Sequence, residues 1–314
     1  MSRVDIHVGE NLDILRTLPS GRFHLIYIDP PFNTGRIQRR TQLRTVRDDD
    51  GDRLGWSGKR YRSIKVGSRS YADAFTDYLA FLEPRIIEAH RLLAPNGSFF
   101  LHLDYREVHY AKVLADAIFG RASFVNEIIW AYDYGARTRA KWSPKHDNIL
   151  WYAKRPGAYT FNVDEADRIP YMAPRLVGAV KAARGKTPTD TWWHTIVSPN
   201  GREKTGYPTQ KPLGIVERIV KVHSNRGDRL LDFFAGSGTL GEAAVRNGRH
   251  VVLVDDNPAA IEVMKRRLAF AKPKMHLLQK PKRKSRPASR TRAKQPAKQP
   301  TKQPAKQPAK AKRR

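Results

Sequence analysis

Short apolar runs alternate with amphipathic segments along most of the first 270 residues. Residues 4–8 and 24–28 have strand composition, and Leu12, Leu15 and Leu18 follow a helical spacing between them. A strand, a helix and a second strand in this order are typical of a parallel α/β sheet. The chain is therefore predicted to be an α/β protein.

The alternation continues with a helix predicted over about 73–93 and strands over 98–103, 127–132 and 148–153. Asp104 and Glu107 have the spacing of a capping box for a further helix. From residue 207 the pattern predicts a helix, a strand, a glycine turn, a helix, a strand and a last helix ending near 271.

Three segments interrupt this pattern. Residues 33–72 are rich in arginine and poor in aliphatic side chains, which predicts a long mobile loop. Residues 154–206 have poor periodicity, which indicates an inserted subdomain, with Trp192 and Trp193 in a small core of its own. Residues 271–314 repeat KQPA and KQPT, cannot bury enough apolar surface, and are predicted to be disordered.

The charge balance points to nucleic acid. The chain has 59 Lys and Arg against 30 Asp and Glu, a formal charge of +29, of which 17 belong to residues 271–314. Such an excess of positive charge favours nucleic acid as the partner over an anionic membrane, because no basic amphipathic helix stands out. The chain has no cysteine, which excludes disulfides and thiolate metal sites. Without a signal region or a long apolar run, it is expected to be cytoplasmic and nucleoid-associated, with no membrane partner.

The segment LIYIDPPFNTG, residues 25–35, ends a strand at a carboxylate. Pro30 and Pro31 lack a backbone donor and have a restricted φ, so the strand stops directly after Asp29. A rigid turn with Phe32 buried is the structural alternative to a catalytic role.

A second motif, LLDFFAGSGTLGEAA, follows much later in the chain. Its strand ends at Asp232, and Gly236 and Gly238 allow a tight turn from which the next helix points its N-terminus at a ligand. Glycine turns without any ligand are also common between strands and helices.

The strand after this turn ends at Asp255, 23 positions after Asp232. An acidic residue at this distance is placed to bind the ribose hydroxyls of a nucleoside ligand. The alternative is a helix N-cap. We expect Asp256 or Asn257 to cap the helix and Asp255 to face the ligand.

Together these motifs resemble the amino-methyltransferases of DNA, which transfer a methyl group from S-adenosylmethionine (AdoMet) to an exocyclic base nitrogen. DPPF resembles their catalytic motif, FAGSGT their AdoMet-binding turn, and YPTQKP at 207–212 the segment before that turn. The catalytic motif comes 203 positions before the AdoMet motif, as in the beta group. LIYIDPPFNTG is also similar to the modification subunits of type III restriction systems.

The resemblance implies a Rossmann-like AdoMet-dependent methyltransferase sheet in permuted motif order. The strands near 230 and 251 become its first and second, residues 4–8 its third and residues 24–28 its fourth. Residues 1–153 are then the catalytic half, 154–206 a target-recognition insert, 207–270 the AdoMet-binding half and 271–314 a disordered basic tail.

The resemblance also implies the site residues. Catalytic roles fall to Asp29, Pro30, Pro31 and Phe32. Cofactor-binding roles fall to Glu10, Lys211, Asp232, Phe233, Gly236, Ser237, Gly238, Thr239 and Asp255. Glu10 has an alternative role as a helix-start residue favoured by the helix dipole.

These residues suit the chemistry of an exocyclic amine, whose lone pair is delocalised into the base. An ionised Asp29 accepts a hydrogen bond from the amine, and the Pro30 carbonyl is a second acceptor on a restrained backbone. Phe32 is placed to stack on a base flipped out of the duplex. No metal is predicted.

The predicted partner is double-stranded DNA, with phosphates contacted by Arg36, Arg39, Arg40 and Arg44, although each alone is typical of a solvated surface charge. In the family, Asp-Pro-Pro-aromatic accompanies N6-adenine more often than N4-cytosine, and Phe32 in place of tyrosine keeps both open. An RNA adenine methyltransferase and a non-enzymatic basic DNA-binding protein are further alternatives. A homodimer and a separately encoded restriction subunit are additional partner hypotheses.

Overall fold

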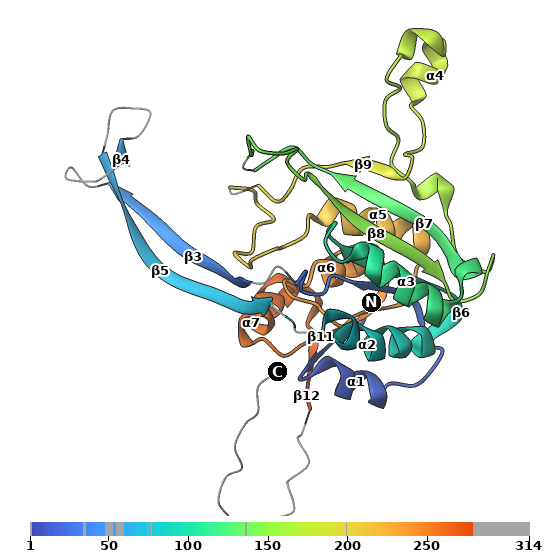
Figure 1. The fold of residues 1–314 in the computed structure, drawn as a ribbon, viewed down its shortest axis with the longest axis horizontal. Coiled ribbons are helices and arrows are strands. Elements are labelled where there is room, and N and C mark those ends of the chain that lie inside the picture. Colours follow the sequence, from blue (N-terminus) through green and yellow to red (C-terminus); the bar gives the residue numbers. More distant parts are fainter. Residues whose placement is uncertain are drawn as a thin grey trace, which may run out of the picture. The chain divides into compact units, whose positions relative to one another are not determined.

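A nine-stranded sheet forms the centre of the fold (Figure 1). Its strands are β1 (Val4–Val8), β2 (Phe23–Ile28), β6 (Leu93–Leu103), β7 (Phe124–Ala131), β8 (His146–Ala153), β9 (Thr191–Trp193), β10 (Arg229–Asp232), β11 (His250–Asp255) and β12 (Lys274–Leu277). They lie in the order β12-β1-β11-β10-β2-β6-β8-β7-β9. Within this sheet, β8 runs antiparallel to its neighbours, β6 and β7. The computed structural model describes residues 2–33, 36–47, 53–54, 60–73, 75, 77–135, 137–198 and 200–278.

Helices cover both faces of the sheet. They are α1 (Asn11–Thr17), α2 (Tyr78–Leu92), α3 (Val108–Phe119), α4 (Ala179–Arg184), α5 (Leu213–His223), α6 (Thr239–Arg246) and α7 (Pro258–Arg267). Single 3-10 turns occur at Arg121–Ser123, Val163–Glu165, Pro174–Leu176 and Ala269–Ala271. Among the helices in the described ranges, none has both the length and the apolar character needed to cross a membrane.

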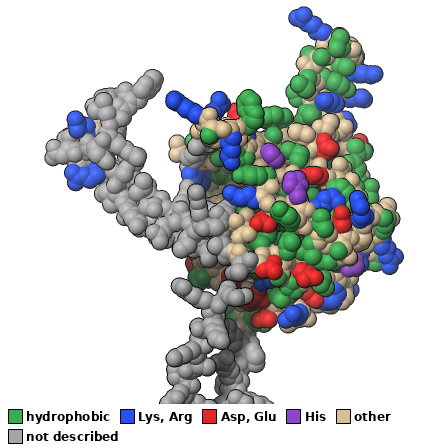
Figure 2. All heavy atoms as spheres, in the orientation of Figure 1, with side chains coloured by type: hydrophobic (Ala, Val, Ile, Leu, Met, Phe, Trp, Pro, Cys, Tyr) green, Lys and Arg blue, Asp and Glu red, His purple; other side chains and the backbone are tan. Residues whose placement is uncertain are grey.

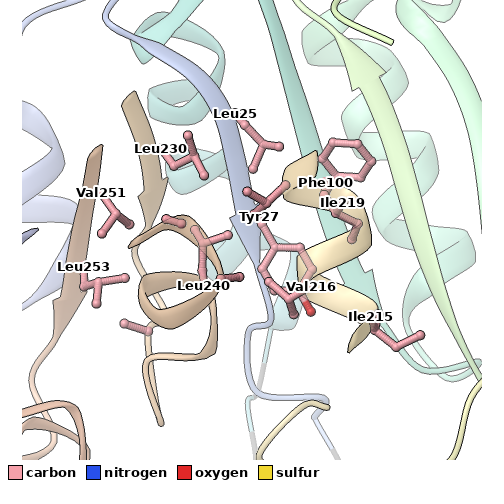
Figure 3. Close-up of a cluster of buried hydrophobic side chains, with 14 of the residues drawn as sticks. Leu25, Tyr27, Phe100, Ile215, Val216, Ile219, Leu230, Leu240, Val251 and Leu253 are labelled. Carbon is pink, nitrogen blue, oxygen red and sulfur yellow. The ribbon is translucent and has the colours of Figure 1, made fainter. Parts of the chain in front are cut away.

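Successive side chains along each central strand point to opposite faces of the sheet and form two hydrophobic cores. Leu25 and Tyr27 point to the face covered by α5, α6 and α7, whereas Ile26 and Ile28 belong to the core with α1, α2 and α3. Figure 3 shows the first core, in which side chains of α5 and α6 meet those of the central strands. Because both faces are buried, the central strands have nearly continuous apolar sequences.

The four strands that the resemblance assigned, at residues 4–8, 24–28, near 230 and near 251, lie side by side in the sheet. β10 lies between β11 and β2, and β1 lies beyond β11. Leu230 pairs with Leu25 and Leu231 with Ile26. Since the paired strands run in the same direction, Asp232 and Asp29 leave the sheet at one edge, which we call the carboxyl edge.

The arginine-rich segment 33–72 is not an irregular loop, and that prediction was wrong for most of it. β3 (Arg36–Arg47) and β5 (Arg60–Asp73) form a long antiparallel ladder, and β4 (Arg53–Leu54) pairs with β5. Antiparallel pairing satisfies the backbone groups of a strand whatever its side chains are. The four arginines predicted to contact DNA lie on β3. Their side chains are outside the described part of the chain, so that role stays a prediction.

The predicted start of the tail and the predicted core of the insert both need correction. Residues 274–277, predicted to belong to the tail, form β12, which pairs in parallel with β1. Trp192 belongs to the main core through β9, while Trp193 is exposed. The small separate core predicted for the insert is therefore wrong at these residues. The remaining tail, 279–314, lies outside the described residues.

The predicted capping box at Asp104 and Glu107 does not form. α3 begins only at Val108, so Glu107 is itself the N-cap and makes no side-chain cap bond. Asp104 instead accepts a hydrogen bond from the amide of Arg106 at 3.0 Å.

Ile219 tests the packing of α5 on the sheet. Its side chain is fully buried, so Ile219→Ala is expected to lower the free energy of unfolding by about 2–5 kcal/mol. Val113→Ala on α3, where the side chain is 70% exposed, is the control and should change it by less than about 0.5 kcal/mol. Denaturant titration measures both; equal effects would contradict the assigned burial.

Candidate active site

A cavity of about 540 Å³ opens at the carboxyl edge. Three carboxylates, Asp29, Asp232 and Asp255, reach it from the ends of β2, β10 and β11. Of the residues predicted for the site, it is lined by Glu10, Asp29, Pro31, Lys211, Asp232, Phe233, Gly236, Ser237, Thr239 and Asp255. Pro30, Phe32 and Gly238 do not line it, although each is adjacent in sequence to a lining residue.

Asp29 is paired with Lys211. The Lys211 Nζ lies 2.6 and 2.7 Å from the two carboxylate oxygens. The two side chains are only 18% and 9% exposed, so little water competes for this pair. Lys211 Nζ also lies 4.4 Å from the centroid of the Phe32 ring, within cation–π range.

Hydrogen bonds fix the chain directly after the two prolines. The Tyr78 hydroxyl donates to the Pro31 carbonyl at 2.6 Å. Asn33 takes a left-handed φ of 53° and donates through its amide to Glu107 at 2.7 Å. Its Oδ1 accepts from the Phe75 amide at 3.0 Å. Glu107 therefore holds the turn that follows Asp29.

The glycine turn needs its glycines for two reasons. Gly236 and Gly238 have φ values of 48° and 73°, in the left-handed region that glycine adopts without strain. A Cβ on Gly236 would lie 3.2 Å from the Tyr207 ring, and one on Gly238 would lie 2.9 Å from Met264 Cγ. Gly238 is the N-cap of α6, so this helix begins beside the cavity.

Asn257 takes the capping role that was predicted for Asp256 or Asn257, and Asp255 lines the cavity. Asn257 caps α7 by accepting from the Ala259 amide at 2.9 Å. Asp255 accepts from the amides of Gly236 and Asn257 at 2.8 and 2.9 Å. Burial raises the pKa of Asp255 to about 6, although these amide hydrogen bonds lower it.

Asp232 is buried more deeply than the other two carboxylates. Its Oδ1 accepts from the Phe234 amide at 2.9 Å. Burial raises its pKa well above the usual range, and the charges of Asp29 and Asp255 add to the rise. Asp232 and Asp255 therefore both favour the protonated form more than an exposed aspartate does.

Glu10 performs the helix-start role and also lines the cavity. One of its carboxylate oxygens accepts from the Asp13 amide at 3.0 Å, and the other pairs with Arg85. Arg85 donates to Asn11 at 2.8 Å and lies over the Phe81 ring, 4.0 Å from its centroid. Arg85 comes from α2, and no sequence pattern connects it with this site.

Sequence reasoning also missed several other lining residues. Among them are Tyr27, Phe75, Phe81, Tyr207 and Asn11. Tyr207 opens the YPTQKP segment and Asn11 follows Glu10, so adjacency to a motif was a usable signal for both. Phe75 and Phe81 carry no such signal.

A buried hydrogen-bond chain begins at the cavity wall. The Tyr27 hydroxyl lies 2.7 Å from His102 Nδ1, and His102 Nε2 lies 3.1 Å from Asp147. The Tyr132 hydroxyl donates to the same carboxylate at 3.1 Å. Burial alone would raise the pKa of Asp147, but hydrogen bonding to His102 and nearby positive charge lower it overall. Burial raises the pKa of Tyr27 far above its usual value, so its phenol stays neutral.

The comparisons with known proteins agree with this geometry. The model of the N6/N4 methyltransferase family, described as DNA methylase, matches residues 23–266. The chain belongs to the N6/N4 DNA methylase family. Members of this family use AdoMet, and DNA is the substrate of this DNA amino-methyltransferase.

Relatives of this methylase include type II methyltransferases and a DNA adenine methyltransferase. It is 30% identical over 254 residues to the type II methyltransferase M.HpaI of Haemophilus parainfluenzae, covering 81% of this chain and 70% of M.HpaI. It is 27% identical over 276 residues to the DNA adenine methyltransferase YhdJ of Escherichia coli K12, covering 84% and 82%.

Comparison with solved structures shows that the methylase shares the fold of other DNA methyltransferases. The M1.HpyAVI–SAM complex matches with a TM-score of 0.54 at 21% identity, covering 84% of this chain and 98% of that one. The cytosine-N4-specific PvuII DNA methyltransferase matches with a TM-score of 0.55 at 14% identity, covering 88% and 96%. The shared fold is a mixed α/β fold with a large, mostly parallel sheet.

The raised pKa of Asp255 predicts a pH dependence for cofactor binding. Ribose hydroxyls donate better to a carboxylate than to a carboxylic acid, so binding should release a proton when Asp255 is protonated. The Kd for AdoMet should be constant well above pH 6 and should rise by up to about tenfold per pH unit below it. Calorimetric titration across this range measures the effect.

Asp255→Asn is the matched variant, because an amide cannot titrate. Its Kd for AdoMet should be higher than that of the unmodified protein at neutral pH. It should also no longer increase as the pH falls below 6. An unchanged slope in this variant would assign the proton to another group, such as Asp232.

Proposed function

We propose that this protein is a site-specific methyltransferase that transfers the methyl group of AdoMet to the N6 amino group of an adenine flipped out of double-stranded DNA. One observation carries the proposal: Asp29 of the DPPF motif and Asp255, at the end of the strand after the AdoMet-binding turn, line the same cavity. The two residues lie at the ends of β2 and β11, which are far apart in the chain and two places apart in the sheet.

The cavity fits AdoMet in its size and in its polar groups. Its volume is within the usual range for small-molecule sites. We assign the ribose hydroxyls to Asp255, and the adenine end to Glu10 with the nearby rings of Phe81 and Phe234. The glycine turn and the start of α6 then face the remaining part of the cofactor. AdoMet supplies an electrophilic methyl group on a sulfonium centre.

Asp29 is assigned to the base amine. A carboxylate has about four acceptor positions on its two oxygens, and Lys211 occupies two of them. The others remain available to the amino protons of the base. The contact with the ammonium group fixes the carboxylate, so Asp29 acts as a hydrogen-bond acceptor held in place before the base arrives.

Lys211 therefore receives a different assignment from the one expected for the YPTQKP segment. Its two carboxylate contacts are with Asp29, so we assign it as a positioning residue for catalysis. The Pro30 carbonyl remains a proposal as second acceptor. Pro30 itself is buried and does not line the cavity.

Adenine is preferred to cytosine for two reasons. Asp-Pro-Pro is the form of the motif that accompanies adenine more often in the group it resembles, and YhdJ is named as an adenine methyltransferase. N4-cytosine is the second candidate, because PvuII, with the same fold, is named as cytosine-N4-specific.

The deciding experiment incubates the purified protein with labelled AdoMet and genomic DNA from a methylation-free host. Modified bases are then mapped by single-molecule sequencing. N6-methyladenine at one short sequence is the expected result. Label on N4 of cytosine would replace the adenine assignment, and label only on an RNA sample run in parallel would replace the DNA substrate.

Asp29→Asn should remove transfer while cofactor binding is kept. The amide presents a donor where the base amine needs an acceptor, so kcat is expected to fall by at least about a hundredfold. The Kd for AdoMet should not change. Glu83→Gln, at an exposed position of α2, is the control for loss of a carboxylate. A parallel loss of AdoMet binding in the Asp29 variant would argue against the assigned role.

Lys211→Met distinguishes the two roles considered for this lysine. A positioning residue for Asp29 predicts a lower kcat with an unchanged Kd for AdoMet, and partial recovery in Lys211→Arg. A cofactor ligand predicts the reverse, a higher Kd with kcat preserved at saturation. Lys265→Met, on the exposed side of α7, is the control for a lost positive charge.

A further inference from the structure

The loop between β7 and β8, residues 132–145, carries a nearly fully exposed tryptophan. Trp142 is 97% exposed. A single exposed apolar side chain is common on soluble proteins, so exposure alone does not indicate a site. Three further observations indicate a binding site at this β7–β8 loop: its structure, its charge and its position.

The loop is an organised turn. Thr138 Oγ1 accepts from the amides of Ala140 and Lys141 at 3.0 and 3.3 Å. Ser143 Oγ accepts from the Thr138 amide at 3.0 Å, which closes the turn on both sides of Trp142. The indole is therefore presented to solvent by a restrained backbone.

Positive charge lies on the same turn as the indole. Arg137, Arg139 and Lys141 are exposed on the same turn, and Asp133 is the only acidic residue in the loop sequence. Figure 2 shows Lys and Arg side chains gathered on the part of the surface where the loop joins β7 and β8. An exposed aromatic ring among cations is the combination that binds stacked bases and their phosphates.

The loop lies at the same edge of the sheet as Asp29. β7 ends and β8 begins at this edge, where Ala131 pairs with His146. β7 is three places from β2 in the sheet, a separation of roughly 14 Å at the usual strand spacing. The major groove of B-DNA is about 12 Å wide. A duplex with its target base at Asp29 would therefore extend as far as the loop.

The base of the loop is also connected to the cavity. The Tyr132 amide donates to the Lys145 carbonyl at 2.9 Å and closes the two ends of the loop. The Tyr132 hydroxyl belongs to the buried chain that runs through Asp147 and His102 to Tyr27 on β2. The loop therefore has a restrained position relative to the strand that carries Asp29.

We propose that Trp142 enters the duplex beside the target base pair and stacks on a base exposed when the target is extruded. Arg137, Arg139 and Lys141 contact the phosphates of that region. The inference rests on the proposed function, because it assigns to the loop part of the work of base flipping. Stacking of the indole offsets the stacking lost by extrusion.

The test compares a fully paired duplex, carrying the sequence mapped by the experiment above, with the same duplex having an abasic site opposite the target base. Extrusion is easier from the second duplex, because the target is unpaired. Trp142→Ala should slow transfer to the paired duplex by roughly 5- to 150-fold, the range for one lost base–aromatic stack. The deficit should shrink on the abasic duplex, and Trp142→Phe should keep most of the activity.

Two controls separate the possible failures. Tyr110→Ala removes an exposed aromatic side chain from α3 and should behave as the unmodified protein on both duplexes. AdoMet binding by Trp142→Ala should be unchanged, which reports an intact fold. An equal deficit on both duplexes, or none, would overturn the role of Trp142. Failure of the unmodified protein to methylate any DNA would instead overturn the proposed function.

Discussion

The pairing of β10 with β2 is the constraint on which the site depends. These strands come from segments about two hundred positions apart, yet Leu230 and Leu231 pair in parallel with Leu25 and Ile26. Parallel pairing requires a common direction, so both chains turn at one edge and deliver Asp232 and Asp29 there. The chain continues from β10 to β11 on one side and from β2 to β6 on the other, so the junction of β10 and β2 is the topological switch point of the sheet, where open α/β folds bind their ligands. The chain order of the two motifs therefore has no effect on where they meet.

Collecting three carboxylates at this point has an electrostatic cost that the protein meets in three different ways. Asp29 has an ammonium partner in Lys211. Asp255 accepts two backbone amides and keeps a pKa of about 6. Asp232 is buried beside both, and its pKa is raised so that the neutral form is favoured. Asp255 and Asp232 therefore both hold a proton more readily than an ordinary aspartate.

Elements with strong periodicity could be predicted from the sequence because their side chains alternate between two buried faces. β2, α5, β10 and β11 belong to this class, whereas the order of the strands in the sheet is seen only in the structure. The hairpin β3–β5 was missed because its ladder is held by the backbone, while its composition is dominated by arginine. β9 was missed because three residues are too few to show alternation.

The residues of the site also fall into those that the sequence could predict and those that it could not. Residues that the chain must place at the end of a strand or in a tight turn, such as Asp29, Asp255 and Gly236, have a local signature. Arg85, Phe81 and the pair between His102 and Asp147 have none, because they come together only when separate elements pack. Lys211 was recognised through its motif, but its contact with Asp29 depends on the juxtaposition of the segment before α5 with the end of β2.

The edge strand β12 has a practical consequence for anyone who shortens this protein. It covers β1, with His276 bonded to Asp5 at 2.8 Å and the Leu278 amide bonded to the Val8 carbonyl at 3.1 Å. A chain cut at residue 271 would leave β1 as an uncovered edge, open to pairing with other chains. It would also remove Leu278 from its packing against Gly9, a residue of the cavity wall. Truncation after Leu278 keeps both the edge and the wall intact.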